Sequence, residues 1–508
     1  MNRRAAIRPS GPSYRFVILG TVWASYLIVY LSRLSVGPLA PFLKEEFDLS
    51  SAEVGSLMSA TAVTYAPAMI AAGLLVDRIG VKRVLVPGTL VAGLCVGLLF
   101  VAPSYPVLLV LLALSGLGCG CIYPSAVNAL VTWFPPRERA TAIGLNQSAI
   151  NVSGIAGAAL LPTVALTMGW QYGFLFVGVL ALAITVVCFV LYREPAGQSL
   201  KPCAVACPGE LRDDGGSGGG GGTALVGGGA ALVGGGAALV GGSATAANGA
   251  DGPVVAGEVD GTTVADRAAA APDESVWAGV LALLRRRDIW LLAAGGLFLG
   301  IVEFSALAHM ILFLKESLAY TAVAAGGLLA LCEAAGAFGK PGSGLVSDRL
   351  FRGHRKPALL ALAIAAFAVC AMFAVSGGDL GWLLYPCLAV FGVAAIGWAG
   401  LYGTLAGEIG GARRAGLAAG LCSAMVNVGI VVGPPVFGLL VDRTGSYRLS
   451  WVLMAAAAGI AVVCWSLLRA PAAATVAAGA TAAGATATDA MRARPAATGR
   501  PGVAYDGA

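Results

Sequence analysis

The chain has 508 residues, of which 58% are hydrophobic and only 11% are charged. Because soluble domains carry about 25% charged residues, this composition excludes a water-soluble globular protein. It also excludes a chain that is disordered along its whole length, since apolar runs dominate it. The formal net charge of +6 does not indicate a nucleic-acid partner, because the placement of the basic residues along the chain has another explanation, given below.

Twelve stretches of the chain are apolar enough to cross a bilayer as helices, which takes about 20 residues each. They lie near residues 15–41, 52–76, 84–102, 106–134, 140–167, 170–192, 288–314, 321–347, 357–376, 380–406, 414–440 and 447–469. Several connections between them are short, so neighbouring helices must run antiparallel. We therefore expect an all-α membrane protein with twelve transmembrane helices.

The basic residues indicate how these helices are oriented. With a cytoplasmic N-terminus, 26 of the 32 Lys and Arg residues lie in the tails, the central segment and the inner connections, against four in the outer connections. The other two, Arg33 and Lys340, lie inside spans. Because basic loops remain on the cytoplasmic side, we expect a multi-pass inner-membrane protein with both termini in the cytoplasm.

Composition divides the chain into five segments. We expect a cytoplasmic tail at 1–13, a six-helix bundle at 14–194, a flexible linker at 195–286, a second six-helix bundle at 287–470 and a disordered cytoplasmic tail at 471–508. The Gly/Ala-rich linker is typical of a flexible tether, and a regulatory or partner-binding loop is the alternative. Of the eleven cysteines only Cys203 and Cys207 lie in a polar stretch, and the chain has two histidines. We therefore expect no metal site and no cofactor.

The two bundles resemble each other in sequence. Gly73–Arg83 reads GLLVDRIGVKR, and Gly344–Lys356 reads GLVSDRLFRGHRK. Asn151 in span 5 has a counterpart in Asn427 of span 11, where the neighbouring residues repeat at the same spacing. Six spans, a long linker and six related spans predict two pseudo-symmetric parallel repeats.

The repeated loop segments are candidates for a conformational latch. An aspartate near a helix end can accept hydrogen bonds from the exposed N–H groups of another helix, or pair with an arginine. Such a contact can form in one conformation and break in another. The alternative is a plain anchor of basic residues at the inner surface. The candidate latch residues are Gly73, Asp77, Arg78, Gly80, Arg83, Asp348 and Arg349.

These features resemble the major facilitator superfamily of secondary transporters, over about residues 14–194 and 287–470. The resemblance implies two six-helix bundles, with spans 1, 4, 7 and 10 lining a central cavity. The YLSRLSVGPLAPFL segment of span 1 resembles the organic-anion and sugar-phosphate transporters, in which an arginine at this place faces an anionic substrate. Span 8, with GKPGSGLVSDR from Gly339, resembles the monocarboxylate and oxalate–formate transporters, and Lys340 stands where they usually have arginine.

Ionisable residues at bilayer depth cost about 2.5–3.5 kcal/mol each, so those inside spans require a reason. Tyr26, Tyr30 and Arg33 lie on one face of span 1, and such an aromatic and cationic stripe suits a carboxylate. A structural arginine paired with Glu303 or Glu333 is the alternative. The candidate substrate-binding residues are Arg33, Lys340, Tyr30, Tyr26, Tyr123, His309 and Tyr402.

Glu303 and Glu333 are the candidate proton carriers, because burial of an acid favours its protonated form. His309 exchanges protons near neutral pH without any help, and it is equally a candidate donor to the substrate or a polar residue at the outer mouth. Glu333 and Lys340 are about 10 Å apart along one helix, too far for a direct pair. Lys340 alternatively extends to the cytoplasmic surface.

The sequence contains no nucleophile–base set and no nucleotide-binding motif, so we do not expect an enzyme. We expect a monomeric secondary active transporter that works by alternating access. Its expected substrate is a small organic anion with a carboxylate group, and its transport is expected to be coupled to protons. A sugar-phosphate or organic-phosphate antiporter is one alternative. A transporter-like sensor that binds its ligand without moving it is another. The expected partners are the anion, protons and the lipid bilayer.

Overall fold

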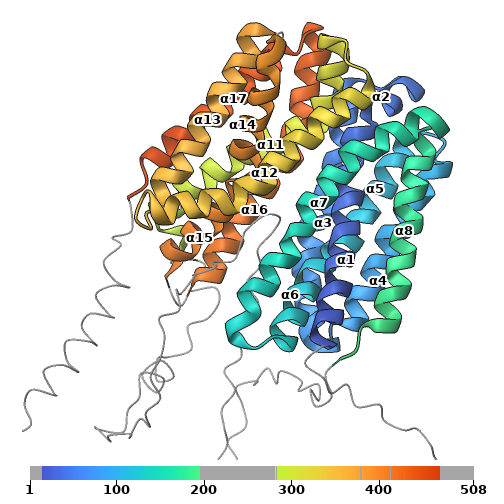
Figure 1. Cartoon of the computed structure of the whole chain (residues 1–508), viewed down its shortest axis with the longest axis vertical. Helices are drawn as coiled ribbons and strands as arrows, with labels where there is room; N and C mark the ends of the chain where they lie inside the picture. Colours follow the sequence, from blue (N-terminus) through green and yellow to red (C-terminus); the bar gives the residue numbers. More distant parts are fainter. Residues whose placement is uncertain (1–13, 195–280, 282, 378–379, 412–413, 470–508) are drawn as a thin grey trace, which may run out of the picture.

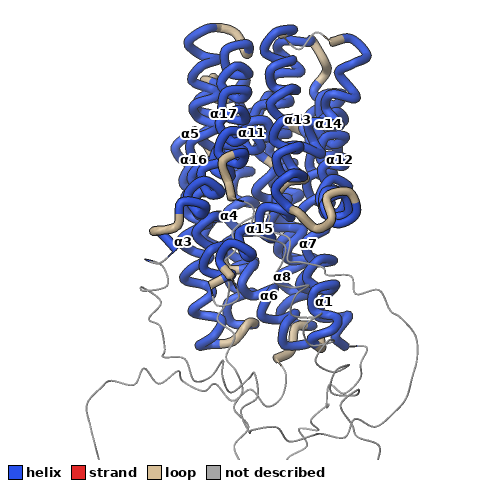
Figure 2. Tube along the Cα trace, turned by 90° about the vertical axis from the view of Figure 1, so that its left-hand side faces the viewer, coloured by secondary structure: helices blue, strands red, loops and turns tan. Residues whose placement is uncertain are grey.

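The structure is a computed structural model that describes residues 14–194, 281, 283–377, 380–411 and 414–469. Nearly all of the expected linker and both expected tails, with Cys203 and Cys207, lie outside these residues. The described part is helical with short connections, and Figure 2 shows no strand in it. Figure 1 shows two groups of helices, which we call the N half (residues 14–194) and the C half (283–469).

The N half begins with a helix that is interrupted once. Its elements are α1 (Tyr14–Leu34), α2 (Val36–Glu46), α3 (Ser51–Ile79), α4 (Lys82–Leu98), η1 (Leu99–Val101), α5 (Tyr105–Gly120), α6 (Ile122–Trp133), α7 (Pro136–Met168) and α8 (Trp170–Leu191). Ser50 starts α3 with a capping box, in which its hydroxyl accepts a hydrogen bond from Glu53 N at 3.2 Å. Gly169, with a φ of 105°, makes the sharp turn between α7 and α8.

The C half repeats this plan. Its elements are α11 (Arg287–Leu318), α12 (Ala322–Arg349), α13 (Arg355–Ser376), η2 (Gly381–Leu383), α14 (Leu384–Ile396), α15 (Ala399–Gly410), α16 (Ala415–Thr444) and α17 (Arg448–Ser466). Thr321 caps α12, since its hydroxyl accepts from Ala324 N at 3.2 Å. In the described part twelve helical stretches, some made of two or three elements, are long and apolar enough to cross a membrane. The twelve predicted spans are thus confirmed.

The halves meet most extensively along two antiparallel helix pairs, α3 with α16 and α7 with α12, and they also meet where α2 packs against α11. Any side chain at Gly55 in α3 would collide with the backbone of Pro434 in α16. Nearby, the Ser59 hydroxyl donates to Val431 O at 2.7 Å. The usual donor to that carbonyl would be the N–H of residue 435, which Pro435 lacks. A hydrogen bond between the halves therefore satisfies a carbonyl that the proline leaves free.

Polar contacts join the halves where α2 ends and α3 begins, and we call this end of the molecule the closed end. Lys44 Nζ lies 2.9 Å from Glu316 Oε1, and Lys315 pairs with Glu45. The Tyr447 hydroxyl donates to Glu316 Oε2 at 2.8 Å. The two oppositely directed ion pairs tie the end of α2 to the end of α11.

Asp442, near the end of α16, caps the start of α3 across the same boundary. Its two oxygens accept hydrogen bonds from Ser51 N at 2.7 Å and Ala52 N at 2.8 Å. The first N–H groups of a helix have no partner within the helix and carry partial positive charge. The carboxylate of Asp442 therefore holds the end of α16 in the C half to the start of α3 in the N half.

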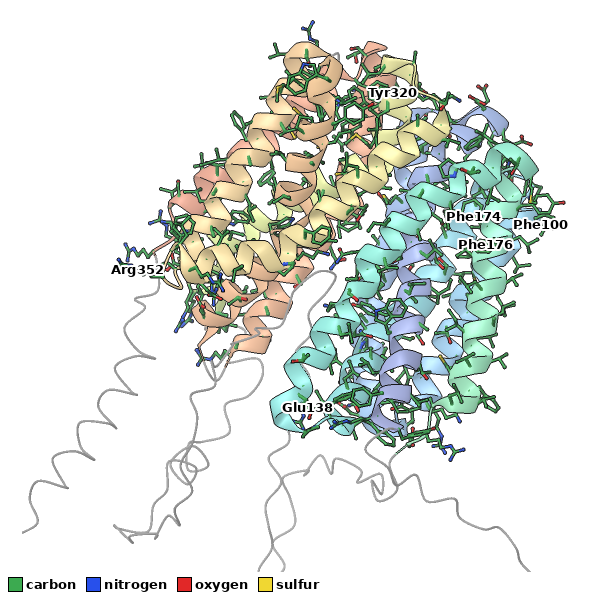
Figure 3. All side chains as sticks on the ribbon, viewed as in Figure 1. Phe100, Glu138, Phe174, Phe176, Tyr320 and Arg352 are labelled. Atoms are coloured by element: carbon green, nitrogen blue, oxygen red, sulfur yellow. The ribbon has the colours of Figure 1, made fainter. Side chains whose placement is uncertain are left out.

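The opposite end, which we call the basic end, carries the exposed Arg78 and Arg83. Figure 3 shows Glu138 at this end of the N half and Tyr320 at the closed end. Glu138 pairs with Arg15 of its own half at 2.9 Å. In Figure 1 the helices of the two halves diverge toward the end where α6 and α15 lie. The molecule is thus held together at the closed end and splayed at the basic end.

Candidate functional site

Arg33 is buried near the end of α1, and its guanidinium rests on aromatic rings. Its Cζ lies 4.1 Å from the centre of the Tyr65 ring in α3 and 5.4 Å from that of Tyr30. The side chain is 6% exposed, and Nη1 has no hydrogen-bond partner among the described residues. Stacking fixes the orientation of the guanidinium and leaves part of its donor fork available to a ligand.

Tyrosine hydroxyls surround this arginine. The rings of Tyr26 and Tyr30 are 5.1 Å apart, and Tyr123 of α6 lies 6.2 Å from Tyr26. The hydroxyls of Tyr26, Tyr30 and Tyr65 are buried, and in the described part of the chain no residue outside this group of tyrosines offers them a hydrogen bond. We call these five residues the arginine–tyrosine cluster. Three buried hydroxyls beside one fixed cation are suited to an oxyanion.

No acid neutralises Arg33 in the described part of the chain, where no carboxylate lies within 4.0 Å of it. Its titratable neighbours are tyrosines and Cys119, which are uncharged near neutral pH. The alternative in which Arg33 pairs with Glu303 or Glu333 is therefore wrong for this conformation. An unpaired buried cation is costly to the fold, and binding of an anion would compensate that cost.

The two predicted proton carriers and Lys340 form a second group in the C half. Glu303 of α11 and Glu333 of α12 interact electrostatically with each other and with Lys340. Trp398 Nε1, just before α15, donates to Glu303 Oε2 at 3.1 Å. Glu333 is 4% exposed, whereas Glu303 and Lys340 are partly exposed.

A helix of the N half completes this group. Lys340 Nζ donates to Asn151 Oδ1 of α7 at 2.9 Å. A methyl group added at Gly154, one turn further along α7, would lie 2.6 Å from the Glu333 carboxyl carbon. Lys340 thus bonds within the protein instead of extending to the surface. We call Glu303, Glu333, Lys340, Trp398 and Asn151 the carboxylate–lysine cluster.

Among the named contacts, His309 touches neither cluster, and Tyr402 touches the carboxylate–lysine cluster only through the ring of Trp398. His309 is fully buried, its Nε2 lies 2.9 Å from Pro434 O, and its ring stacks on Phe437 at 4.9 Å. The Tyr402 hydroxyl donates to Cys422 O at 3.1 Å, and its ring packs on Trp398. Both side chains thus bind α16 within the C half.

The candidate latch residues lie at the basic end, and their named contacts stay within one half. Asp77 Oδ1 accepts from Asn128 Nδ2 of α6 at 3.3 Å. Asp348 pairs with Arg355 at the start of α13, and Arg355 Nε lies 3.6 Å from Glu408. The remaining candidates at this end are the exposed Arg78, Arg83 and Arg349, with Gly73 and Gly80, the latter at a φ of 91°.

Two residues outside the predicted set occupy prominent positions. Tyr65 forms the ring beneath Arg33, and only its place in a span singled it out in the sequence. Asp442 closes the boundary between the halves. A clear signal for it exists, because GLLVDR occurs at 73–78 and again at 438–443.

Comparison with known proteins matches this chain to one family of membrane transporters. The family model of the Major Facilitator Superfamily matches residues 22–421. A probable sulfoacetate transporter of Cupriavidus necator is 25% identical over 455 residues, which cover 88% of this chain and 92% of that protein. A hexuronate transporter of Bacillus subtilis is 27% identical over 36% of this chain and 44% of its own length.

Two further matches bear on alternatives and on the fold. A membrane sensor protein of Salmonella typhimurium is 27% identical over 37% of this chain and 43% of that protein. The fold is similar to the crystal structure of a bacterial homolog of the human lysosomal transporter Spinster, in an inward-facing and unoccupied conformation. The TM-score is 0.64 at 15% identity, over 90% of this chain and 96% of that one.

Proposed function

The chain belongs to the Major Facilitator Superfamily, and from this premise we propose that it is a secondary active transporter that moves a small organic anion, with a carboxylate as its anionic group, together with protons. The superfamily consists of transporters, not enzymes. The observation that carries the proposal is Arg33, a buried cation with a free donor and no acidic partner in the described part of the chain.

The arginine–tyrosine cluster supports an anionic substrate over a neutral or cationic one. A neutral sugar would leave Arg33 without a counter-charge, and a cation would be repelled. The planar guanidinium matches the two oxygens of a carboxylate. The relatives named for sulfoacetate and hexuronate bear names of organic anions, each with a carboxylate. Tyr26, Tyr30, Tyr65 and Tyr123 would hold its remaining polar groups, and Lys340, His309 and Tyr402 are weaker candidates from the C half.

The carboxylate–lysine cluster supports coupling to protons. Two acids share one lysine, so a single positive charge cannot balance both carboxylates when both are ionised. Proton uptake by one of them would restore the balance. The cluster also touches the N half through Asn151, so its charge can respond to the contact between the halves.

Alternating access would interchange the joined and the splayed end. Since α3 and α16 are antiparallel, Asp77 near the end of α3 is placed toward the start of α16, as Asp442 is placed toward the start of α3. We infer that Asp77 caps α16 when the basic end closes, with the other latch residues holding the loop. In the conformation described here Asp442 is engaged.

Replacement of Asp442 by alanine is expected to open the closed end. The loss of a charged helix cap costs about 1–2 kcal/mol, which shifts the balance between the two conformations about five- to thirtyfold. Spin labels at the exposed positions Glu46 and Ser317 would report a longer distance between the halves. Asp77→Ala is the matched control and should not lengthen it. An unchanged distance distribution in Asp442→Ala would show that this cap does not hold the end closed.

The placement of basic residues leads us to propose an inner-membrane protein with its basic end in the cytoplasm. Impermeant thiol reagents should then label Cys203 and Cys207 in inside-out vesicles and not in intact cells, because both lie in the segment between the halves. A variant in which both are serine provides the background. Labelling of these two cysteines in intact cells would reverse the orientation.

Uptake into liposomes tests the function as a whole. Purified protein should take up a labelled sulfonate–carboxylate or sugar acid, and an imposed proton gradient should drive its accumulation above the external concentration. Phosphate esters form the second arm, because a sugar-phosphate antiporter would exchange them. Stabilisation of the folded protein by an anion without any uptake would favour the sensor, to which the relative named a membrane sensor lends some weight.

A further inference from the structure

We propose that Asn151 is a positioning residue that couples the carboxylate–lysine cluster to the contact between the two halves. This inference rests on the proposed proton-coupled transport of an anion. It assigns a role to a neutral side chain of the N half, whereas the charged residues of the cluster all belong to the C half. The observation behind it is the hydrogen bond from Lys340 Nζ to Asn151 Oδ1.

The surroundings of Lys340 make this bond distinctive. In the described part of the chain, the charged groups that act on the ammonium are Glu303 from α11 and Glu333 from α12. The side facing α14 and α15 contributes Trp398, which is uncharged and bonded to Glu303. Among the described residues neither acid lies within 4.0 Å of the ammonium, and Asn151, itself 9% exposed, is the hydrogen-bond acceptor that α7 offers to it.

The position of the bond along the interface is equally informative. From the closed end toward the basic end, α7 meets α12 at Ala158 and Gly326, then at Gly154 and Glu333. The bond between Asn151 and Lys340 comes next in this order and is the one of the three contacts nearest the basic end, toward which the two halves diverge (Figure 1). The distance between Asn151 and Lys340 therefore changes when the two halves rotate against each other.

The chemistry of the ammonium gives the coupling a mechanism. Lys340 has three donors and no acceptor, so Asn151 competes with the two carboxylates for them. While Lys340 donates to Asn151, its ammonium stabilises the two ionised carboxylates less. One of the two acids can then hold a proton. When the halves move and Asn151 withdraws, the ammonium turns to the carboxylates, and the proton leaves. Proton binding and conformation are then linked: the protonated cluster favours the conformation in which Lys340 bonds to Asn151, and that conformation favours protonation.

The chain supplies a matched control at the equivalent place in the other half. Asn427 lies on α16, the counterpart of α7, and is 5% exposed. Its Nδ2 donates to Ser423 O of the same helix at 3.0 Å, so its named bond does not cross to the N half. Asn427→Ala removes the same group from a similar depth without touching the carboxylate–lysine cluster.

The experiment compares two modes of transport by the full-length protein in liposomes, with the labelled anion that the wild type takes up. Asn151→Ala should lower proton-driven accumulation from about tenfold per pH unit of imposed gradient toward a ratio of about one. Exchange of internal for external anion without a gradient should stay within about twofold, and its dependence on pH should flatten. Asn427→Ala should keep the wild-type ratio of the two modes.

The outcomes separate this inference from the function on which it rests. If the wild type moves no anion, the proposed function fails. If the wild type accumulates the anion and Asn151→Ala does so equally well, the inference fails alone. If Asn151→Ala does not fold, Asn151→Asp replaces it. A carboxylate there would hold Lys340 in an ion pair and should slow both modes about tenfold or more, and undiminished accumulation by this variant would also overturn the inference.

Discussion

Replacement of Arg33 by alanine is expected to reduce anion binding and uptake at least about a hundredfold. Removal of one partner from a buried charge pair costs about 3–5 kcal/mol, and Arg33 is the cation of a cluster with no acid of its own in the described part of the chain. The guanidinium also supplies a donor that no group in the described segments uses. The substrate would lose both its counter-charge and its orientation.

The same substitution should leave the ligand-free protein as stable as the wild type or make it more stable. An unpaired buried cation opposes folding, so its loss relieves a cost. This sign distinguishes a binding arginine from a structural one, whose removal would expose a partner and destabilise the protein. We expect an unchanged or higher melting temperature without substrate, and no further rise on addition of the anion, because nothing then binds the folded state.

Three variants serve as controls for this prediction. Arg33→Lys keeps the charge but not the planar fork over the Tyr65 ring, and should lose about tenfold in affinity. Tyr65→Phe keeps the ring and removes one hydroxyl, an effect of about two- to tenfold. Arg15→Ala on the same helix breaks an ion pair with Glu138 at the basic end and should bind normally. Full uptake by Arg33→Ala at equal membrane abundance would remove the anion hypothesis.

The architecture could be predicted from the sequence because it follows from long-range composition. Twelve apolar stretches and the repeat of the DR-containing loops at Gly73–Arg83 and Gly344–Lys356 depend on no particular side-chain contact. The bilayer requires each stretch to satisfy its own backbone hydrogen bonds, so a helix is the only outcome. The same reasoning gives helix ends to within a few residues and no further information about which faces meet.

The sequence could predict which site residues lie together only where they belong to the same helix. Tyr26, Tyr30 and Arg33 share a face of α1, and the helical repeat reveals this. That Tyr65 of α3 lies beneath Arg33 depends on how α1 and α3 pack together, which no spacing in the sequence encodes. The predicted roles of the substrate-binding residues remain predictions.

The separation of Arg33 from the acids has the same origin. Charge alone permits a pair between Arg33 and Glu303, since both are costly at bilayer depth. The structure instead gives Glu303 the indole of Trp398 and a place near Lys340. The division of charge between the two halves is therefore a property of helix packing, and it separates the fixed cation from the groups that can change their charge.

The carboxylate–lysine cluster leads to the second large effect, expected for Glu303→Gln and Glu333→Gln. Glutamine keeps the shape of a protonated glutamic acid but cannot release a proton. We expect that one of the two variants, the one that replaces the proton carrier, loses proton-driven accumulation altogether while it continues to exchange anions. Loss of one mode with retention of the other indicates coupling, whereas loss of both would indicate damage to the anion site or the fold.

The size of the effect follows from the energy of the gradient. One pH unit is worth 1.36 kcal/mol per proton, so one proton carried with each monoanion gives about tenfold accumulation in the wild type. The variant without its carrier should reach a ratio of about one at every imposed gradient. Glu138→Gln, outside both clusters, should keep the wild-type slope. If both Glu303→Gln and Glu333→Gln retain it, neither acid carries the proton, and Lys340 would then serve only to balance their charge.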